Sequence, residues 1–208
     1  NLWSFPDYFV ALSSYAKNWA GRVNPFVKIE YIPNGVDIQK FNPTGKKLEI
    51  DLKKPIILTV GALTKTKRID LVIKAVSMLK GVSLLVVGDG ELKDELKSLG
   101  DNLLGKRFQL IKLPFEKMPE AYRAADLFTL VSEAYYSFEI VLVEAMSTNL
   151  PVVANDDPIR REIVDDAGII VDPTDTTNYS EILGNSLKKN WGNKPRIQAE
   201  KFSWEKVA

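Results

Sequence analysis

Six short apolar runs, each followed by a segment with helical spacing, constrain the fold more than any other feature of this sequence. The runs lie between Pro55 and Asp172 and read PIILTVG, VSLLVVGDG, FQLIKL, LFTLVS, PVVA and GIIVD. Because they do not alternate apolar and polar residues, we expect strands that are buried on both faces. Strands that alternate with helices of about ten residues indicate right-handed βαβ units. The sequence therefore predicts a Rossmann-like α/β fold, an open, doubly wound parallel sheet of about six strands.

Capping and turn residues set the expected ends of the helices. We expect Gly100 to end the helix ELKDELKSLG, Pro119 to lie in a first turn, and Asp157 to cap IRREIVDD. Before the sheet, a strand over residues 8–12 runs into a helix capped by Ser13 or Ser14, and a second strand covers residues 28–32. Asn34 and Gly35 then predict a turn, because both residue types tolerate positive φ.

The composition excludes several kinds of chemistry. The 208 residues include no Cys and no His, which excludes disulfides, Cys or His metal sites, a His base and a Cys nucleophile. We expect no metal and no tightly held cofactor. The net charge of +1 gives no support to a nucleic-acid partner. A cytoplasmic location fits the absence of Cys. We see no signal peptide and no run of 18 apolar residues. Since the first residue is Asn1 rather than Met, we expect a fragment or a processed product.

The loop GALTKTKR, from Gly61 to Arg68, follows the first strand of the predicted sheet. Lys65, Lys67 and Arg68 stand there just before a helix. Ligands of such sheets lie outside the carboxyl ends of the strands, and cations at that place favour an anion such as phosphate. A solvated loop with Asp70 as a local partner is an equally good interpretation.

Within the segment SFEIVLVEAMST, Glu144 is the only polar side chain from Ile140 to Met146, so the helix is apolar nearly all round. A buried carboxylate is costly unless it is hydrogen-bonded. It could accept ribose hydroxyls, while the amides at the helix start bind a pyrophosphate. The alternative is a carboxylate that bonds to the protein's own backbone, and we favour the binding role.

Three further loops follow predicted strands. Gly88 in GDGE lacks the spacing of a dinucleotide fingerprint and is typical of a tight βα turn. Phe115 and Met118 could wall a flat base or pack on the core. We interpret Arg160 and Arg161 as an exposed basic pair with a structural or solvated role.

Taken in order, these motifs resemble a known family. IPNGVD, LTVGALTKTKRIDLVIKAV, LLVVGDGE and SFEIVLVEAMSTNLPVVANDDP, followed by AGIIVDPTD, occur in the order found in retaining glycosyltransferases of family 4. The resemblance implies the C-terminal half of a two-domain GT-B glycosyltransferase. It divides the chain into the end of an acceptor-side domain with a linker (residues 1–41), a nucleotide-sugar-binding domain (42–190) and a C-terminal helical segment (191–208).

The resemblance also implies roles for individual residues. Lys67 corresponds to the lysine that contacts donor phosphate, Glu144 to a glutamate that contacts the ribose, and Ile140 and Val141 to the pair whose amides approach the phosphates. The donor would be a UDP-, GDP- or ADP-sugar. The acceptor would be a sugar, a lipid-linked sugar or a protein, bound through the missing N-terminal domain. Docking on a membrane surface stays open. The full set expected at the donor is Gly61, Lys65, Lys67, Arg68, Gly88, Phe115, Met118, Tyr136, Ser137, Phe138, Glu139, Ile140, Val141 and Glu144.

This sequence departs from the family pattern at three positions. Ala62 replaces a phosphate-binding arginine, Tyr136 replaces a sugar-contacting glutamate, and Glu139 replaces a glycine. Glu139 must point away from the phosphate or weaken its binding. We considered Lys65 or Arg68 as a substitute for the arginine, and Glu139 or Glu133 as a substitute for the glutamate.

The departures keep a second function open. The chain could be a non-catalytic nucleotide-sugar-binding or scaffold subunit of a glycosyltransferase complex, supported by Ala62 and Tyr136. A GT-B relative with other chemistry, such as an epimerase or a phosphorylase, is a third interpretation. An NAD dehydrogenase is disfavoured, because the glycine fingerprint is missing.

Overall fold

The structure is a computed structural model that describes residues 6–134 and 138–207. Within this range the strands are β1 (Tyr8–Ala11), β2 (Lys28–Tyr31), β3 (Ile56–Val60), β4 (Ser83–Val87), β5 (Phe108–Ile111), β6 (Leu127–Leu130), β7 (Val152–Asn155) and β8 (Gly168–Val171). The α-helices are α1 (Ser14–Val23), α2 (Ile69–Ser77), α3 (Lys93–Leu104), α4 (Met118–Ala124), α5 (Ile140–Ser147), α6 (Pro158–Val164), α7 (Thr176–Lys188), α8 (Lys194–Ala199) and α9 (Trp204–Val207). Short 3₁₀ turns are η1 (Lys65–Lys67), η2 (Gly105–Arg107), η3 (Phe115–Lys117), η4 (Asp165–Ala167) and η5 (Glu200–Phe202).

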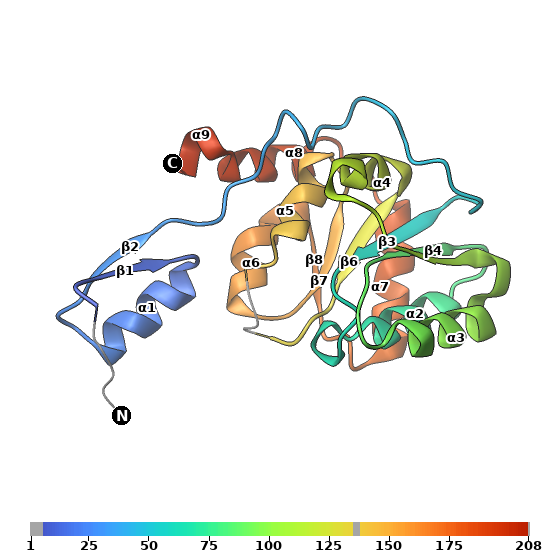
Figure 1. The fold of residues 1–208 in the computed structure, drawn as a ribbon, viewed down its shortest axis with the longest axis horizontal. Coiled ribbons are helices and arrows are strands. Elements are labelled where there is room, and N and C mark those ends of the chain that lie inside the picture. The colour runs from blue at the N-terminus through green and yellow to red at the C-terminus, as the bar shows by residue number, and fades with distance from the viewer. Residues whose placement is uncertain (1–5, 135–137, 208) are drawn as a thin grey trace.

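The main sheet has six parallel strands in the order β5-β4-β3-β6-β7-β8, which confirms the predicted doubly wound fold (Figure 1). The chain builds outward from β3 toward β5 and then returns to add β6, β7 and β8 on the other side. The direction of winding therefore reverses between β3 and β6, which pair directly through Ile57 and Leu127. In an open α/β sheet this reversal opens a crevice at the carboxyl ends of the two strands.

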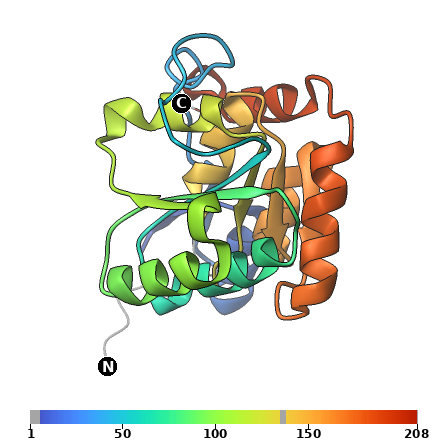
Figure 2. The ribbon, with the colours of Figure 1, turned by 90° about the vertical axis from the view of Figure 1, so that its right-hand side faces the viewer.

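Helices cover both faces of the sheet, so its inner strands β4, β3, β6 and β7 are buried throughout (Figure 2). Leu84 and Val86 of β4 belong to the core cluster shared with α2, α3 and α7, whereas Leu85 and Val87 belong to the cluster shared with α4, α5 and α6. Successive side chains of a strand point to opposite faces. Because both faces are apolar, these strands show no alternation in the sequence.

Two local predictions were wrong, and packing explains both. Gly100 lies inside α3 rather than at its end, which falls at Gly105. A side chain at Gly100 would collide with the ring of Phe108. Asn34 and Gly35 do not have positive φ. Gly35 lies against the indole of Trp204, so close approach rather than turn geometry favours glycine there.

The N-terminal residues form a small unit of their own, in which β1 and β2 pair in parallel beside α1 (Figure 1). Ser13 caps α1, as predicted, by accepting from the Ala16 amide at 3.1 Å. The chain then passes along the C-terminal segment, where Val36 bridges Ser203, and α8 packs on α5. The domain limits at residues 41 and 190 stay predictions. Among the described residues, no helix has the length and hydropathy that a membrane crossing requires.

Candidate functional site

The loops after β3 and β6 meet at the reversal point, and Arg68 joins them. Its Nε donates to the Val131 carbonyl at 2.7 Å and its Nη2 to the Ser132 carbonyl at 2.8 Å. The Glu133 amide adds a hydrogen bond back to the Thr66 carbonyl at 2.8 Å. Arg68 has φ of 47° and ends the short turn η1, so the chain turns sharply before α2 begins. Arg68 therefore holds the two loops together, and two of its nitrogens are committed to backbone carbonyls.

Lys67 lies over the carboxyl end of β3 and reaches across to the start of α5. Its aliphatic stem would lie 3.7 Å from a side-chain carbon built on Gly61, so the stem runs along the Gly61 backbone. Its Nζ donates to both carboxylate oxygens of Glu139, at 2.7 and 2.8 Å. The Lys67 side chain is 11% exposed. The structure thus places Lys67, Gly61 and Glu139 together at the crevice.

Glu139 is the central acceptor of a buried polar cluster. Its Oε1 also accepts from Ser132 Oγ at 2.8 Å and from Arg160 Nη2 at 3.3 Å. Arg160 is fully buried and donates in addition to Ser132 Oγ and to Asp157 Oδ2, each at 2.7 Å. Glu139 has φ of 58° and ψ of 66°, the left-handed region in which glycine is most at ease. Its carboxylate is turned toward Lys67 at the carboxyl end of β3 and is only 5% exposed.

Glu144 lies one turn further along α5 and is 6% exposed. Its partner is a side chain rather than the backbone, since Tyr122 of α4 donates its hydroxyl to Glu144 Oε2 at 2.7 Å. Burial raises the pKa of Glu144, while the Tyr122 hydrogen bond and the nearby charge of Lys40 act in the opposite direction. Burial also raises the pKa of Tyr122, so the phenol stays a donor. Among residues 6–134 and 138–207, the hydrogen-bond partner of Glu144 is Tyr122, at Oε2, so the carboxylate keeps acceptor capacity for a ligand hydroxyl.

A shallow cavity of about 290 Å³ lies over the carboxyl ends of β3, β4 and β5. Gly61, Gly88 and Met118 line it, and Asp89 and Lys112 pair across its rim at 2.8 Å. A side chain at Gly88 would collide with the Gly61 carbonyl, so the close approach of the two loops favours glycine. The three residues thus share one surface beside Lys67.

Phe115 is not part of this cavity. Its ring packs 5.8 Å from that of Phe41, and Lys40 Nζ lies 3.8 Å from its centroid. Met118 therefore lines the cavity and Phe115 does not, where the sequence left open whether the two wall a base or pack on the core.

The remaining predicted residues divide into three groups. Ile140 and Val141 form the first turn of α5, where amides have no acceptor within the helix. Lys65 is exposed, and the buried ring of Phe138 packs 5.8 Å from that of Phe202. Tyr136 and Ser137 lie outside the described residues.

Sequence reasoning missed three members of the site, Tyr122, Ser132 and Arg160. The prediction that Arg160 is exposed was wrong, whereas Arg161 beside it is exposed and pairs with Asp156. The signal for Arg160 was available, because Asp157 stands three residues earlier on the same helix face. Asp157 does cap α6, as predicted, by accepting from the Ile159 and Arg160 amides at 2.8 and 2.9 Å.

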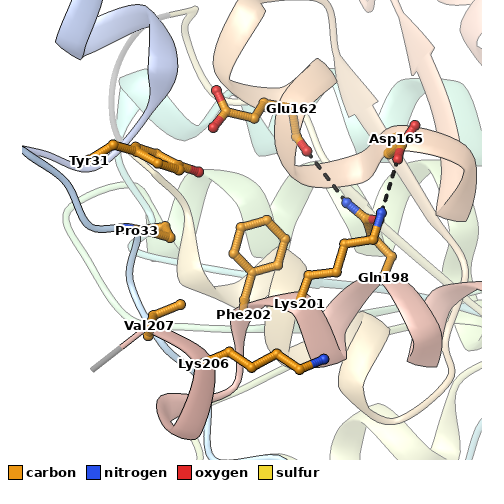
Figure 3. A pocket seen from close by; sticks show the side chains of 9 residues that line it. All are labelled: Tyr31, Pro33, Glu162, Asp165, Gln198, Lys201, Phe202, Lys206 and Val207. Carbon is orange, nitrogen blue, oxygen red and sulfur yellow. Dashed lines mark hydrogen bonds and ion pairs between the residues drawn. The ribbon is translucent and has the colours of Figure 1, made fainter.

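A second cavity, of about 460 Å³, lies between the N-terminal unit and the C-terminal segment (Figure 3). Tyr31, Glu162 and Phe202 line it, and Lys201 pairs with Asp165 at its edge. Glu162 lies in the last turn of α6, and Asp165 follows the end of that helix. The polar cluster around Glu139 instead contacts the start of α6, through Arg160 and Asp157. This cavity is therefore distinct from the reversal-point site.

Comparison with known proteins identifies the family. The sequence model of the glycosyl transferases group 1 family matches residues 41–202. This chain belongs to that family. A Campylobacter jejuni relative, N-acetylgalactosamine-N,N'-diacetylbacillosaminyl-diphospho-undecaprenol 4-alpha-N-acetylgalactosaminyltransferase, is 31% identical over 87% of this chain and 52% of its own length. D-inositol 3-phosphate glycosyltransferase from Mycobacteroides abscessus is 30% identical over 87% of this chain and 44% of its own length. The group 1 chain thus spans about half the length of these relatives.

Solved structures place the fold among GT-B glycosyltransferases. Sucrose-phosphate synthase from Thermosynechococcus elongatus has a TM-score of 0.83 and 23% identity, covering 98% of this chain and 56% of its own. Anabaena Alr3699/HepE, solved in complex with UDP-glucose, has a TM-score of 0.80 and 21% identity, covering 98% of this chain and 62% of its own. The group 1 chain therefore has the fold of one half of a GT-B enzyme.

Arg160 and Arg161 offer a matched test of the buried cluster. We expect Arg160→Met to lower the free energy of unfolding by about 3 kcal/mol or more, because Glu139 and Asp157 each lose a buried cationic partner. Arg161→Ala should change it little, since that side chain is 63% exposed. Urea unfolding of both variants measures the difference. Equal effects of the two substitutions would show that the cluster does not hold the site together.

The raised pKa of Glu144 predicts a specific pH dependence of stability. The folded protein holds the Glu144 proton above the ordinary value of 4.5, while the unfolded chain has already lost it. Stability therefore falls as the pH rises from about 4.5 through the pKa of the folded state. Glu144→Gln cannot ionise and keeps an acceptor for Tyr122. We expect the stability of Glu144→Gln relative to the native chain to grow with pH across this window. Denaturant unfolding between pH 4 and 8 tests this, and a constant difference would contradict it.

Proposed function

We propose that this group 1 domain binds a nucleoside-diphosphate sugar at the carboxyl ends of β3 and β6, as the donor half of a retaining glycosyltransferase. The observation that carries the proposal is that Lys67 reaches the start of α5 through Glu139, on the same helix that carries the buried Glu144. A lysine ammonium and the amides of a helix start both favour an anion. A carboxylate with a free lone pair favours a neighbouring hydroxyl. A nucleoside diphosphate offers both the anion and the neighbouring hydroxyl, because its phosphate lies beside its ribose.

The geometry supports a division of roles along the crevice. Lys67 and the amides of Ile140 and Val141 would take the diphosphate, and Glu144 would accept from the ribose. The cavity lined by Gly61, Gly88 and Met118 is the place for the base, because it lies at the same sheet edge.

The chemistry in this proposal is electrostatic. When the glycosidic bond to the diphosphate breaks, negative charge develops on the leaving oxygen. Preorganised donors that face this charge lower the barrier. Lys67 has that role, and the buried guanidinium of Arg160 holds Ser132 and Glu139 beside it. Arg68 is a poor substitute for the arginine missing at Ala62, since its Nε and Nη2 bond to backbone carbonyls. Lys65 is a weak substitute as well, because its side chain is exposed and its charge is well screened.

A second candidate is a non-catalytic subunit that binds a nucleotide sugar or serves as a scaffold. The observation in its favour is that the carboxylate of Glu139 engages Lys67. Ala62 and Tyr136, where the family has an arginine and a glutamate, point the same way. Glycosyl transfer by the full-length protein from a donor that this domain binds would decide for the enzyme. Binding without any transfer or donor hydrolysis would decide for the subunit.

Lys67 and Lys65 provide a matched pair for testing the phosphate site. We expect Lys67→Ala to weaken the binding of UDP, GDP or ADP by about 10- to 150-fold, the value of a hydrogen bond to a charged group. Lys65→Ala should change the affinity by less than about threefold, because an exposed charge is well screened. Calorimetric titration with the three diphosphates measures both.

The same titration tests the proposal as a whole. If none of the three diphosphates or their sugars binds the native chain at millimolar concentration, the proposed function is wrong. If Lys65→Ala weakens binding as much as Lys67→Ala does, the assigned position of the phosphate is wrong.

A further inference from the structure

The carboxylate of Glu139 has the contacts that a bound phosphate oxygen would need. It accepts from Lys67 through both oxygens, from the Ser132 hydroxyl and from the Arg160 guanidinium. Glu139 also stands immediately before the first turn of α5, and its side chain is 5% exposed. An ammonium, a guanidinium, a hydroxyl and a helix start form a typical environment for a phosphate group. Here they surround an internal carboxylate.

The charges within this cluster are balanced without any ligand. Lys67 and Arg160 supply two positive charges, and Glu139 and Asp157 supply two negative charges. A diphosphate that entered with Glu139 in place would bring further negative charge next to a buried carboxylate. Like charges at such short range and low solvent exposure repel strongly. The diphosphate and the Glu139 carboxylate therefore exclude each other at Lys67.

The backbone conformation at Glu139 is unfavourable for a residue other than glycine, so the bonds of its carboxylate must offset a cost. A residue other than glycine costs about 1–2 kcal/mol in the left-handed region. Glu139 nevertheless adopts φ of 58°, and Lys67, Ser132 and Arg160 all bond to its side chain. The ion pair thus balances a strained backbone. If the Glu139 carboxylate left Lys67, no side-chain bond would offset the backbone strain. This favours either the binding of another anion at Lys67 or the re-formation of the pair between Lys67 and Glu139.

We propose that Glu139 is an internal competitor of the donor phosphate and sets how tightly the donor binds. This inference rests on the proposed function. In the unliganded protein Glu139 occupies the phosphate position, and the donor binds only when Lys67 exchanges the carboxylate for phosphate. The apparent affinity is then the intrinsic affinity multiplied by the fraction of molecules in which Glu139 has left. A site of this kind favours ligands with high local negative charge, such as a diphosphate, over singly charged anions.

The test compares Glu139→Gly and Glu139→Gln with the native chain in titrations with UDP, GDP and ADP. Glutamine keeps the shape and an acceptor but removes the charge, while glycine also removes the backbone strain. We expect both variants to bind the preferred diphosphate at least about tenfold more tightly, because the competing anion is gone. Glu181→Gln, an exposed residue in α7, is the control for charge removal and should leave the affinity unchanged. Adding Lys67→Ala to Glu139→Gly should abolish the gain.

The outcomes separate this inference from the proposed function. The native chain could bind a diphosphate while neither Glu139 variant binds it more tightly. In that case Glu139 has only a structural role and the inference is wrong, but the proposed function stands. If neither the native chain nor the Glu139 variants bind any diphosphate, both are wrong. Thermal unfolding accompanies each titration. Should Glu139→Gly fail to fold, the isosteric Glu139→Gln decides, since it can still accept from Lys67 and Ser132.

Discussion

The ion pair between Lys67 and Glu139 joins two segments that the sheet topology would otherwise send apart. The loop after β3 runs toward β4, and the loop after β6 runs toward β7, so their chains diverge at the reversal point. Arg68 holds the two loops through backbone carbonyls, and the pair then joins the β3 loop to the start of α5. Buried ion pairs add little net stability, but they strongly penalise arrangements in which either charge is left alone. The pair therefore specifies the geometry of the crevice more than it stabilises the fold.

This constraint explains how the same residues fit two different functions. A cation in a crevice needs an anion, and the anion is either supplied by the ligand or built into the chain. In the unliganded protein it is built in, since Glu139 stands in the left-handed position that suits glycine. A transferase with this arrangement must exchange one anion for another in each cycle. A scaffold subunit could keep the pair closed. A transferase and a scaffold subunit would share this family and fold. They would differ in whether the pair between Lys67 and Glu139 separates to admit the donor.

The sequence predicted the sheet well because strands that are buried on both faces appear in it as continuous apolar runs. Each of the six apolar runs became a strand, and Asp157 capped the helix it was expected to cap. Gly100 shows the limit of local signals. Its glycine suits a helix end, but the reason for it is the ring of Phe108, which tertiary packing brings alongside.

The site was less predictable, because its contacts join residues that are distant in the sequence. The donor-binding roles of Lys67 and Glu144 stay predictions. Glu139 lies 72 residues from Lys67, and no local pattern in the sequence pairs them. Arg160 was expected at the surface on polarity alone. Its burial depends on Ser132 and Glu139, which arrive from the loop after another strand. Charge at one position can be read from a sequence, whereas the partner that neutralises it is set by the fold.

The most direct measurement is a crystal structure of this chain with the nucleoside diphosphate that it binds best. We predict a phosphate oxygen within hydrogen-bond distance of Lys67 Nζ, a ribose hydroxyl at Glu144, and the Glu139 carboxylate turned away from Lys67. A nucleotide bound elsewhere, with the pair between Lys67 and Glu139 intact, would contradict it.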